Sequence, residues 1–185
     1  MPESLTFLDE ESFCKCINLT DVKLSHATTT LAKKAFNKCT SLETIVLPRE
    51  LTTMFSRVFE GCTNLKNINI YDTNVTTIPY RCFKDCTSLK DIGILNGSDT
   101  YIYKVQKFDT QCFANSGIEK IVFASPFEII VGNSAFQDCK SLSSVDFDSR
   151  AGVPMHLQSG CFSGCTALTS TIDMGKVELE GGKIF

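Results

Sequence analysis

The chain has 185 residues, of which 43% are hydrophobic and 21% charged, and its net charge is −3. This composition provides enough apolar residues to pack a core and enough charge to stay in solution. No basic cluster is visible along the sequence, and nucleic-acid binding needs a cationic footprint, so we expect no nucleic-acid partner. No apolar stretch is long enough to span a bilayer, so we expect no membrane insertion of this segment.

A phenylalanine is followed three residues later by cysteine and six residues later by leucine, again and again along the chain. The phenylalanines recur at a nearly constant step, and a fixed period of about 20–50 residues indicates a repeat architecture. The copies, of which the fifth is degenerate, are Phe13-Cys16-Leu19, Phe36-Cys39-Leu42, Phe59-Cys62-Leu65, Phe83-Cys86-Leu89, Phe113-Ser116-Ile118, Phe136-Cys139-Leu142 and Phe162-Cys165-Leu168.

Each copy predicts two short extended segments and a corner. After the leucine, apolar and polar residues alternate, which is typical of a strand with one buried face. The buried positions are Val22 and Leu24, Ile45 and Leu47, Ile68 and Ile70, Ile92 and Ile94, Ile121 and Phe123, Val145 and Phe147, and Ile172 and Met174. A second segment, often preceded by threonine, holds an apolar residue five positions before each phenylalanine. These residues are Leu8, Leu31, Met54, Ile78, Phe108, Val131 and Leu157.

No segment has the pattern of a long amphipathic helix. A single unit cannot bury its apolar face alone, but stacked units bury a continuous column. We therefore expect residues 1–185 to form one elongated, mostly β repeat solenoid.

One unit shows the full motif. It reads Leu47-Pro48, Leu51-Thr52-Thr53-Met54, Val58-Phe59-Glu60-Gly61-Cys62 and Leu65-Lys66-Asn67-Ile68. This pattern resembles the BspA-like class of leucine-rich repeats. The resemblance implies a right-handed curved coil with one parallel sheet, short extended segments on the opposite side and little regular helix. It implies no particular chemistry, because one fold hosts many functions.

The two ends fall inside the repeat. Met1 occupies the slot of Leu47, and Phe185 follows Phe162 by the commonest step between phenylalanines in this chain. We expect about seven repeats with partial repeats at both ends, as in a fragment excised from a longer repeat protein. Such a fragment is expected to be monomeric, with end-to-end association through uncapped ends as the alternative. No signal peptide is visible in it.

Nine of the ten cysteines occupy repeat positions, which favours buried structural thiols. Six follow the corner, and Cys82, Cys112 and Cys161 take the small-residue slot that Ala35 and Ala135 fill elsewhere. Disulfides between neighbouring turns remain an alternative, since equivalent positions come close to bridging range. The two histidines are not paired with each other, so we expect no metal site and no cofactor.

Nothing in the sequence indicates catalysis. No glycine-rich phosphate loop, zinc-protease motif or paired carboxylates occur. His26 and His156 are expected in surface loops, and we expect no enzymatic activity. An accessory domain of an enzyme, using Cys161 or His156, is the alternative, and Cys161→Ser would then abolish activity.

A solenoid binds partners through its extended surface. Outward strand positions predict a moderately apolar centre at Val46, Tyr71, Leu95 and Val122, with Tyr71 as an exposed contact residue. The longest unit, between Phe83 and Phe113, contains an insertion with Tyr101 and Tyr103, and insertions often map to the binding face.

The resemblance implies a protein-interaction module, often part of a cell-surface adhesin that binds host or matrix proteins. We expect the parent protein at the cell surface and a protein ligand. An intracellular scaffold or effector is the alternative.

Overall fold

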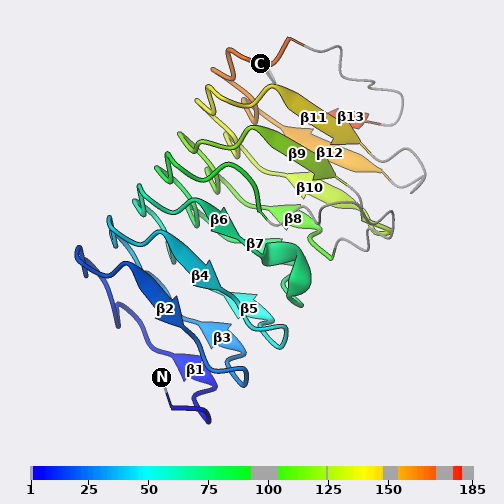
Figure 1. Cartoon of the computed structure of the whole chain (residues 1–185). Coiled ribbons are helices and arrows are strands. Elements are labelled where there is room, and N and C mark those ends of the chain that lie inside the picture. The colour runs from blue at the N-terminus through cyan, green and yellow to red at the C-terminus, as the bar shows by residue number, and fades with distance from the viewer. Residues whose placement is uncertain (1, 93–103, 124, 148–153, 170–176, 181–185) are drawn as a thin grey trace.

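The computed structural model describes residues 2–92, 104–123, 125–147, 154–169 and 177–180. In this part of the chain, short parallel strands stack turn upon turn into a solenoid (Figure 1). One 3₁₀ turn, η1 (Ile70–Asp72), is the only helical element there. The mostly β repeat fold expected from the sequence is confirmed.

The strands form two columns, each running along one side of the solenoid (Figure 1). The first column contains β2 (Asp21–Lys23), β4 (Thr44–Val46), β6 (Asn67–Ile68), β9 (Lys120–Phe123) and β11 (Ser144–Phe147). The second contains β1 (Phe7–Leu8), β3 (Thr30–Leu31), β5 (Thr53–Met54), β7 (Thr77–Ile78), β8 (Lys107–Phe108), β10 (Ile129–Val131), β12 (Met155–Gln158) and β13 (Val177–Glu180). The second extended segments therefore also form parallel ladders.

The register of the ladders follows the sequence period. Val22 pairs with Ile45 and Ile45 with Ile68, so each residue pairs with its equivalent in the next repeat. Ladder pairing in the first column weakens after β6, which joins the next turn through a single bridge between Asn67 and Asp91. The column resumes with β9 and β11.

The corner of each turn alternates between two backbone conformations. The residues two before and two after every corner phenylalanine have positive φ, and eleven of these fourteen residues are not glycine. In the second turn the N–H groups of Lys34, Phe36 and Lys38 donate to carbonyls of the next turn, at 3.1, 2.9 and 2.8 Å. The intervening N–H groups bond within their own turn. The left-handed conformation, which costs about 1–2 kcal/mol per non-glycine residue, thus directs alternate N–H groups along the solenoid axis.

The corner phenylalanines form one continuous stack. Successive ring centroids from Phe13 to Phe162 lie 5.1–5.5 Å apart, with interplanar angles of 18° or less. Phe108 and Phe123 pack at an angle against this stack in the later turns. Burial of such rings contributes about 1.5–3 kcal/mol each, so the stack is a major source of core stability.

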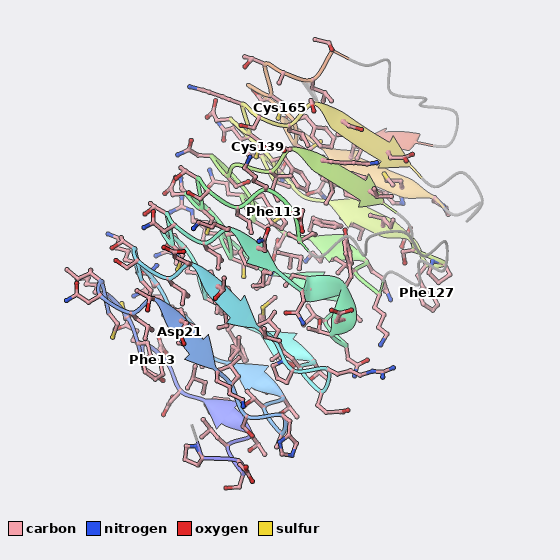
Figure 2. The ribbon with its side chains drawn as sticks, viewed as in Figure 1. Phe13, Asp21, Phe113, Phe127, Cys139 and Cys165 are labelled. Carbon is pink, nitrogen blue, oxygen red and sulfur yellow. The ribbon has the colours of Figure 1, made fainter. Side chains whose placement is uncertain are left out.

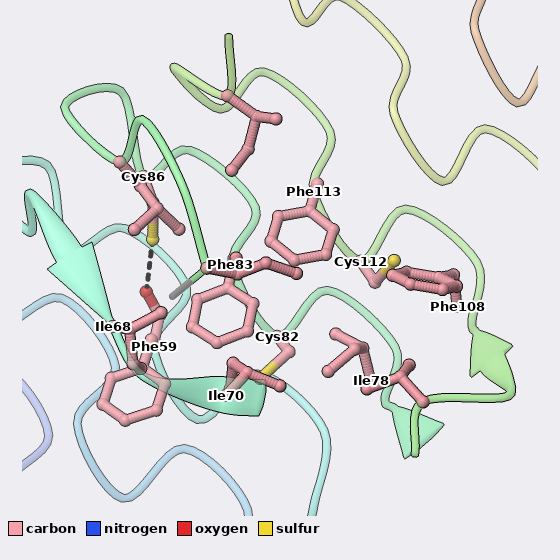
Figure 3. Close-up of a cluster of buried hydrophobic side chains, with 14 of the residues drawn as sticks. Phe59, Ile68, Ile70, Ile78, Cys82, Phe83, Cys86, Phe108, Cys112 and Phe113 are labelled. Atoms are coloured by element: carbon pink, nitrogen blue, oxygen red, sulfur yellow. Dashed lines mark hydrogen bonds between the residues drawn. The ribbon is translucent and has the colours of Figure 1, made fainter. Parts of the chain in front are cut away.

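The corner cysteines tie successive turns together. The thiol of Cys62 donates to the carbonyl of Phe36 at 3.1 Å. The thiol of Cys86 likewise donates to the carbonyl of Phe59 at 3.0 Å, as Figure 3 shows. The same bond to the phenylalanine carbonyl of the preceding turn, at 3.0–3.1 Å, is made by Cys39, Cys139 and Cys165. These carbonyls also accept the N–H of the residue three positions later, which is a cysteine in every case except Ser116.

The expectation of nine buried cysteines is wrong at one position. Eight thiols are buried, but Cys16 is exposed because no described turn covers the first corner. Cys14, the cysteine outside the pattern, is half-buried, and its sulfur lies 3.8 Å from Oδ1 of Asn37. All ten cysteines are free, so the disulfide alternative does not apply to this structure.

The fifth turn reaches its strand with one residue fewer than its neighbours. Gly117 stands between Ser116 and Ile118, and its N–H donates to the carbonyl of Cys86 at 3.1 Å. A Cβ at this position would lie 2.2 Å from the carbonyl oxygen of Thr87. Only glycine allows the shortened turn to pass this close to the turn before it.

We expect Gly117→Ala to lower the free energy of unfolding by about 3 kcal/mol, because the new methyl group overlaps a backbone oxygen. Gly160→Ala is the matched control, since its Cβ would meet nothing nearer than 3.7 Å. It should cost only about 1 kcal/mol for the positive φ. Urea unfolding of both variants measures the difference, and equal costs would contradict the close approach.

Candidate functional site

The described surface is hollowed along the first strand column. One depression, of about 830 Å³, lies over β2 and β4 and the loops that follow them. A second, of about 430 Å³, lies over β4 and β6. Both are lined by Thr44, Ile45 and Val46, so β4 lies between them. We refer to the surface of β2, β4 and β6 as the β4 face.

Val46 is the most prominent apolar group on this face. Its side chain is 71% exposed, while its neighbour Ile45 points into the core and is buried. The strand alternation that buries Ile45 therefore presents Val46 to solvent, as the sequence predicts. An exposed apolar side chain between two hollows is a suitable anchor for a partner.

An asparagine holds the edge of the β4 face in place. The chain leaves the ladder after Ile68 to enter η1, so the backbone of Asn69 does not continue the ladder. Its side chain instead pairs with Leu47, accepting the N–H at 2.8 Å and donating to the carbonyl at 3.0 Å. Asn69 thus extends the support of β4 beyond the end of β6.

Tyr71 is not the exposed contact residue that the sequence predicts. It lies in η1, is half-buried and packs against the core. Its hydroxyl donates to the carbonyl of Val122 on β9 at 3.4 Å. The structure therefore brings Tyr71 and Val122 together, and both side chains are less exposed than that of Val46.

The remaining candidates, Leu95, Tyr101 and Tyr103, lie outside the described residues. Their part in binding stays a prediction.

Charged groups surround the larger hollow. Lys23, His26 and Arg49 line it together with Glu3, Asp21 and Glu50. Among the described residues, these three basic side chains take part in no ion pair. The β4 face therefore combines an apolar anchor with charges of both signs around it, which is the composition of a contact surface with a polar rim.

The structure argues against Cys161 as a nucleophile. Burial raises the pKa of its thiol to about 12, so the thiol stays protonated at neutral pH. His156, the other residue of the enzymatic alternative, has its Nε2 2.8 Å from Oε1 of Glu128. His156 is therefore bonded to a carboxylate, and the thiol of Cys161 is not present as a reactive thiolate.

The described part of the chain also lacks two other kinds of functional element. It contains no group of three or more histidine, cysteine or acidic side chains placed to hold a metal ion. It contains no helix of the length and apolarity that crossing a membrane requires.

The stacked parallel turns with their cysteine corners define the class of the protein as a leucine-rich-repeat solenoid. The profile of the BspA type leucine-rich-repeat region matches residues 1–104 and 106–180 in six copies. The chain belongs to this family. Membership supports a role as a protein-interaction module. No curated protein matches the chain.

Solved structures of bacterial leucine-rich-repeat proteins are similar to this chain. One from Eubacterium ventriosum ATCC 27560 has 22% identity and a TM-score of 0.57, over 95% of this chain and 38% of the other. TpLRR of T. pallidum has 25% identity and a TM-score of 0.55, over 89% and 61%. A leucine rich cell surface protein from Faecalibacterium prausnitzii A2-165 has 16% identity and a TM-score of 0.55, over 90% and 64%. The chain spans less than two thirds of each of these proteins.

The sequence predicts the exposure of Val46 but neither the hollows nor the role of Asn69. The larger hollow involves the loops after β2 and β4, which belong to successive repeats and are distant in the sequence. The sequence holds one signal for the role of Asn69. Its amide side chain can pair with a backbone N–H and carbonyl, and it stands at the repeat position that Lys23 and Val46 occupy in the preceding turns.

The buried thiols predict a loss of stability at alkaline pH. Burial raises the pKa of Cys39 from 9.0 to about 11, and it also raises the pKa of Cys62, Cys82, Cys86 and Cys112. Because the folded pKa exceeds the unfolded one, the contribution of these thiols to stability is complete below the unfolded pKa and falls as pH rises above it.

Each such thiol should remove about 1.4 kcal/mol of the free energy of unfolding per pH unit above ~9. Several thiols titrate together, so the loss is a large share of a typical stability of about 5–15 kcal/mol. Urea unfolding at pH 7, 8, 9 and 10 measures it. An unfolding free energy that stays constant to pH 10 would contradict protonated, buried thiols.

Proposed function

We propose that this solenoid is a non-enzymatic protein-interaction module of a cell-surface adhesin, and that it binds host or matrix proteins through the β4 face. The exposure of Val46 between two hollows is the observation that carries the proposal. Family membership supports an interaction module, and one similar structure is that of a leucine rich cell surface protein.

The β4 face fits a protein partner better than a small molecule. Its two hollows lie side by side with β4 between them, so a partner that covers both must have a broad contact surface. The charges of Lys23, Arg49 and Glu50 can form ion pairs or hydrogen bonds with a partner around the Val46 anchor, as rim residues of protein interfaces do.

Val46→Asp tests this assignment, because a charge at the anchor must be desolvated when a partner covers it. Binding of the chain to a panel of purified matrix proteins, including collagen, laminin and fibronectin, is measured by surface plasmon resonance. We expect at least one protein of the panel to bind, and Val46→Asp to weaken that binding about tenfold or more.

Phe127→Asp is the matched control. Phe127 is also apolar and 57% exposed, and it lies at the loop edge of the solenoid, away from β2 (Figure 2). It should change affinity less than twofold. Equal losses in both variants, or no binding to any protein of the panel, would contradict the proposal.

A third variant, Tyr101→Ala with Tyr103→Ala, tests the insertion, which we expect to contribute to affinity without being needed for folding.

A further inference from the structure

Basic residues that are dispersed in the sequence gather at the corners of the first four turns. We call residues 10–15, 33–38, 56–61 and 80–85 the corner ridge, since each range surrounds one stacked phenylalanine. It contains seven of the chain's 18 basic residues, namely Lys15, Lys33, Lys34, Lys38, Arg57, Arg81 and Lys84. With four acidic residues it has a net charge of +3, whereas the whole chain has −3.

Three of these cations occupy equivalent positions in successive turns. Lys34, Arg57 and Arg81 share the same left-handed slot, and the phenylalanine rings of these turns are 5.4–5.5 Å apart. The hydrogen bond to Glu11 and the charge of that carboxylate raise the pKa of Lys34, and the charge of Arg57 opposes this with a smaller effect. Lys34 pairs with Glu11, and Nε of Arg57 lies 3.7 Å from Oε2 of Glu60, so Arg81 is the member of this column that forms no ion pair among the described residues. Exposed ion pairs of this kind are weak, so the three cations remain able to attract an anion that runs along the column.

An aromatic ring fixes two of the guanidinium groups. Cζ of Arg57 lies 5.5 Å and that of Arg81 5.0 Å from the centroid of Tyr80, within the range of cation–π contacts. Nε of Arg81 also donates to Oε1 of Gln111 at 2.7 Å. These contacts hold the guanidinium groups in place but leave the charge of Arg81 without a carboxylate.

Four ridge cations form no ion pair among the described residues: Lys15, Lys38, Arg81 and Lys84. Gly61 opens the space between two of them. Its missing side chain leaves room for the stem of Lys38, whose Cγ would be 3.2 Å from a Cβ at Gly61, and its N–H donates to the carbonyl of Lys84 at 2.8 Å. The corner is therefore free of a side chain at this slot, beside the stem of Lys38 on one turn and the backbone of Lys84 on the next.

The same corners in later turns carry almost no charge. Residues 110–115, 133–138 and 159–164 contain a single charged residue, Asp138. None of the seven ridge cations lines either hollow of the β4 face. The ridge is thus a bounded surface, separate from the β4 face.

We propose that the corner ridge binds a sulfated polysaccharide that lies along the solenoid axis. The four ranges have net charges of −1, +3, 0 and +1, so the positive charge lies mainly in the second and fourth turns. A positive surface that extends over several turns suits a linear polymer with anionic groups on successive sugar rings rather than a small anion. Guanidinium groups match sulfate oxygens in a bidentate manner. Single-stranded nucleic acid instead needs open aromatic faces for its bases, whereas the ring of Tyr80 already contacts two guanidinium groups.

Heparin is the probe, and its dissociation constant is measured by isothermal titration calorimetry from 50 to 200 mM NaCl. The ridge variant is Lys38→Gln with Arg81→Gln and Lys84→Gln, since Gln111 already occupies the slot of Arg81 with positive φ. We expect it to bind heparin at least about tenfold more weakly. The slope of the logarithm of its binding constant against the logarithm of the NaCl concentration should become shallower by about one for each removed cation that contacts the polymer.

Lys66→Gln with Lys90→Gln and Lys120→Gln is the matched control, because it removes the same charge from residues in or beside the first strand column. It should change affinity less than threefold. Equal losses in the two triple variants would overturn the ridge site. Equal affinity for desulfated heparin, or for DNA of the same length, would overturn the assignment to a sulfated polysaccharide, as would no heparin binding at 50 mM NaCl.

Two further measurements keep the outcome interpretable. If the ridge triple variant does not fold, Lys38→Gln and Lys84→Gln are measured singly, and each should weaken heparin binding more than Lys120→Gln does. Val46→Asp should leave heparin binding unchanged, so failure at the ridge is distinguishable from failure at the β4 face.

Discussion

The carbonyl group of the corner phenylalanine receives two hydrogen bonds in most turns, and much of the structure follows from them. One comes from the N–H of the residue three positions later, usually a cysteine, and closes the corner within the turn. The other comes from a cysteine thiol of an adjacent turn, as between Cys62 and Phe36. The first bond fixes the shape of one turn and the second helps to fix its distance from the next. The spacing of the phenylalanine rings, 5.1–5.5 Å, then lets them stack along the whole solenoid.

Both proposed binding surfaces depend on this corner. Because the turns repeat in register, Ile45 faces inward and Val46 outward, and the strands of the first column lie side by side as a surface (Figure 1). The alternating backbone of the corner also sets the ridge. The positive φ of Lys34, Arg57 and Arg81 gives all three the same position in successive turns.

Much of the fold is predictable because the signals lie within one turn. Apolar residues at fixed distances from Phe59 are enough to predict the core position of Cys62 and the strand residue Ile68. The exposure of Cys16 escapes the pattern because it depends on what covers the first turn, and not on the repeat. Tyr71 is misassigned from the sequence because η1 interrupts the strand pattern and lets its ring pack against the core. The corner ridge is not apparent from the sequence for a related reason. Its cations come from different repeats and form no long run of basic residues. They become neighbours only when equivalent positions of successive repeats are stacked.

The contribution of the thiol-to-carbonyl bond is measured most directly by comparing Cys62→Ala with Cys82→Ala. Both thiols are fully buried, and each substitution removes one sulfur atom from the core. Cys82 occupies the slot of Ala35 and Ala135, whereas the thiol of Cys62 donates to the carbonyl of Phe36. If this bond holds neighbouring turns together, Cys62→Ala should cost about 1 kcal/mol more free energy of unfolding than Cys82→Ala. Equal costs in urea unfolding would contradict the role of the thiol and leave ring stacking and the backbone ladders as the links between turns.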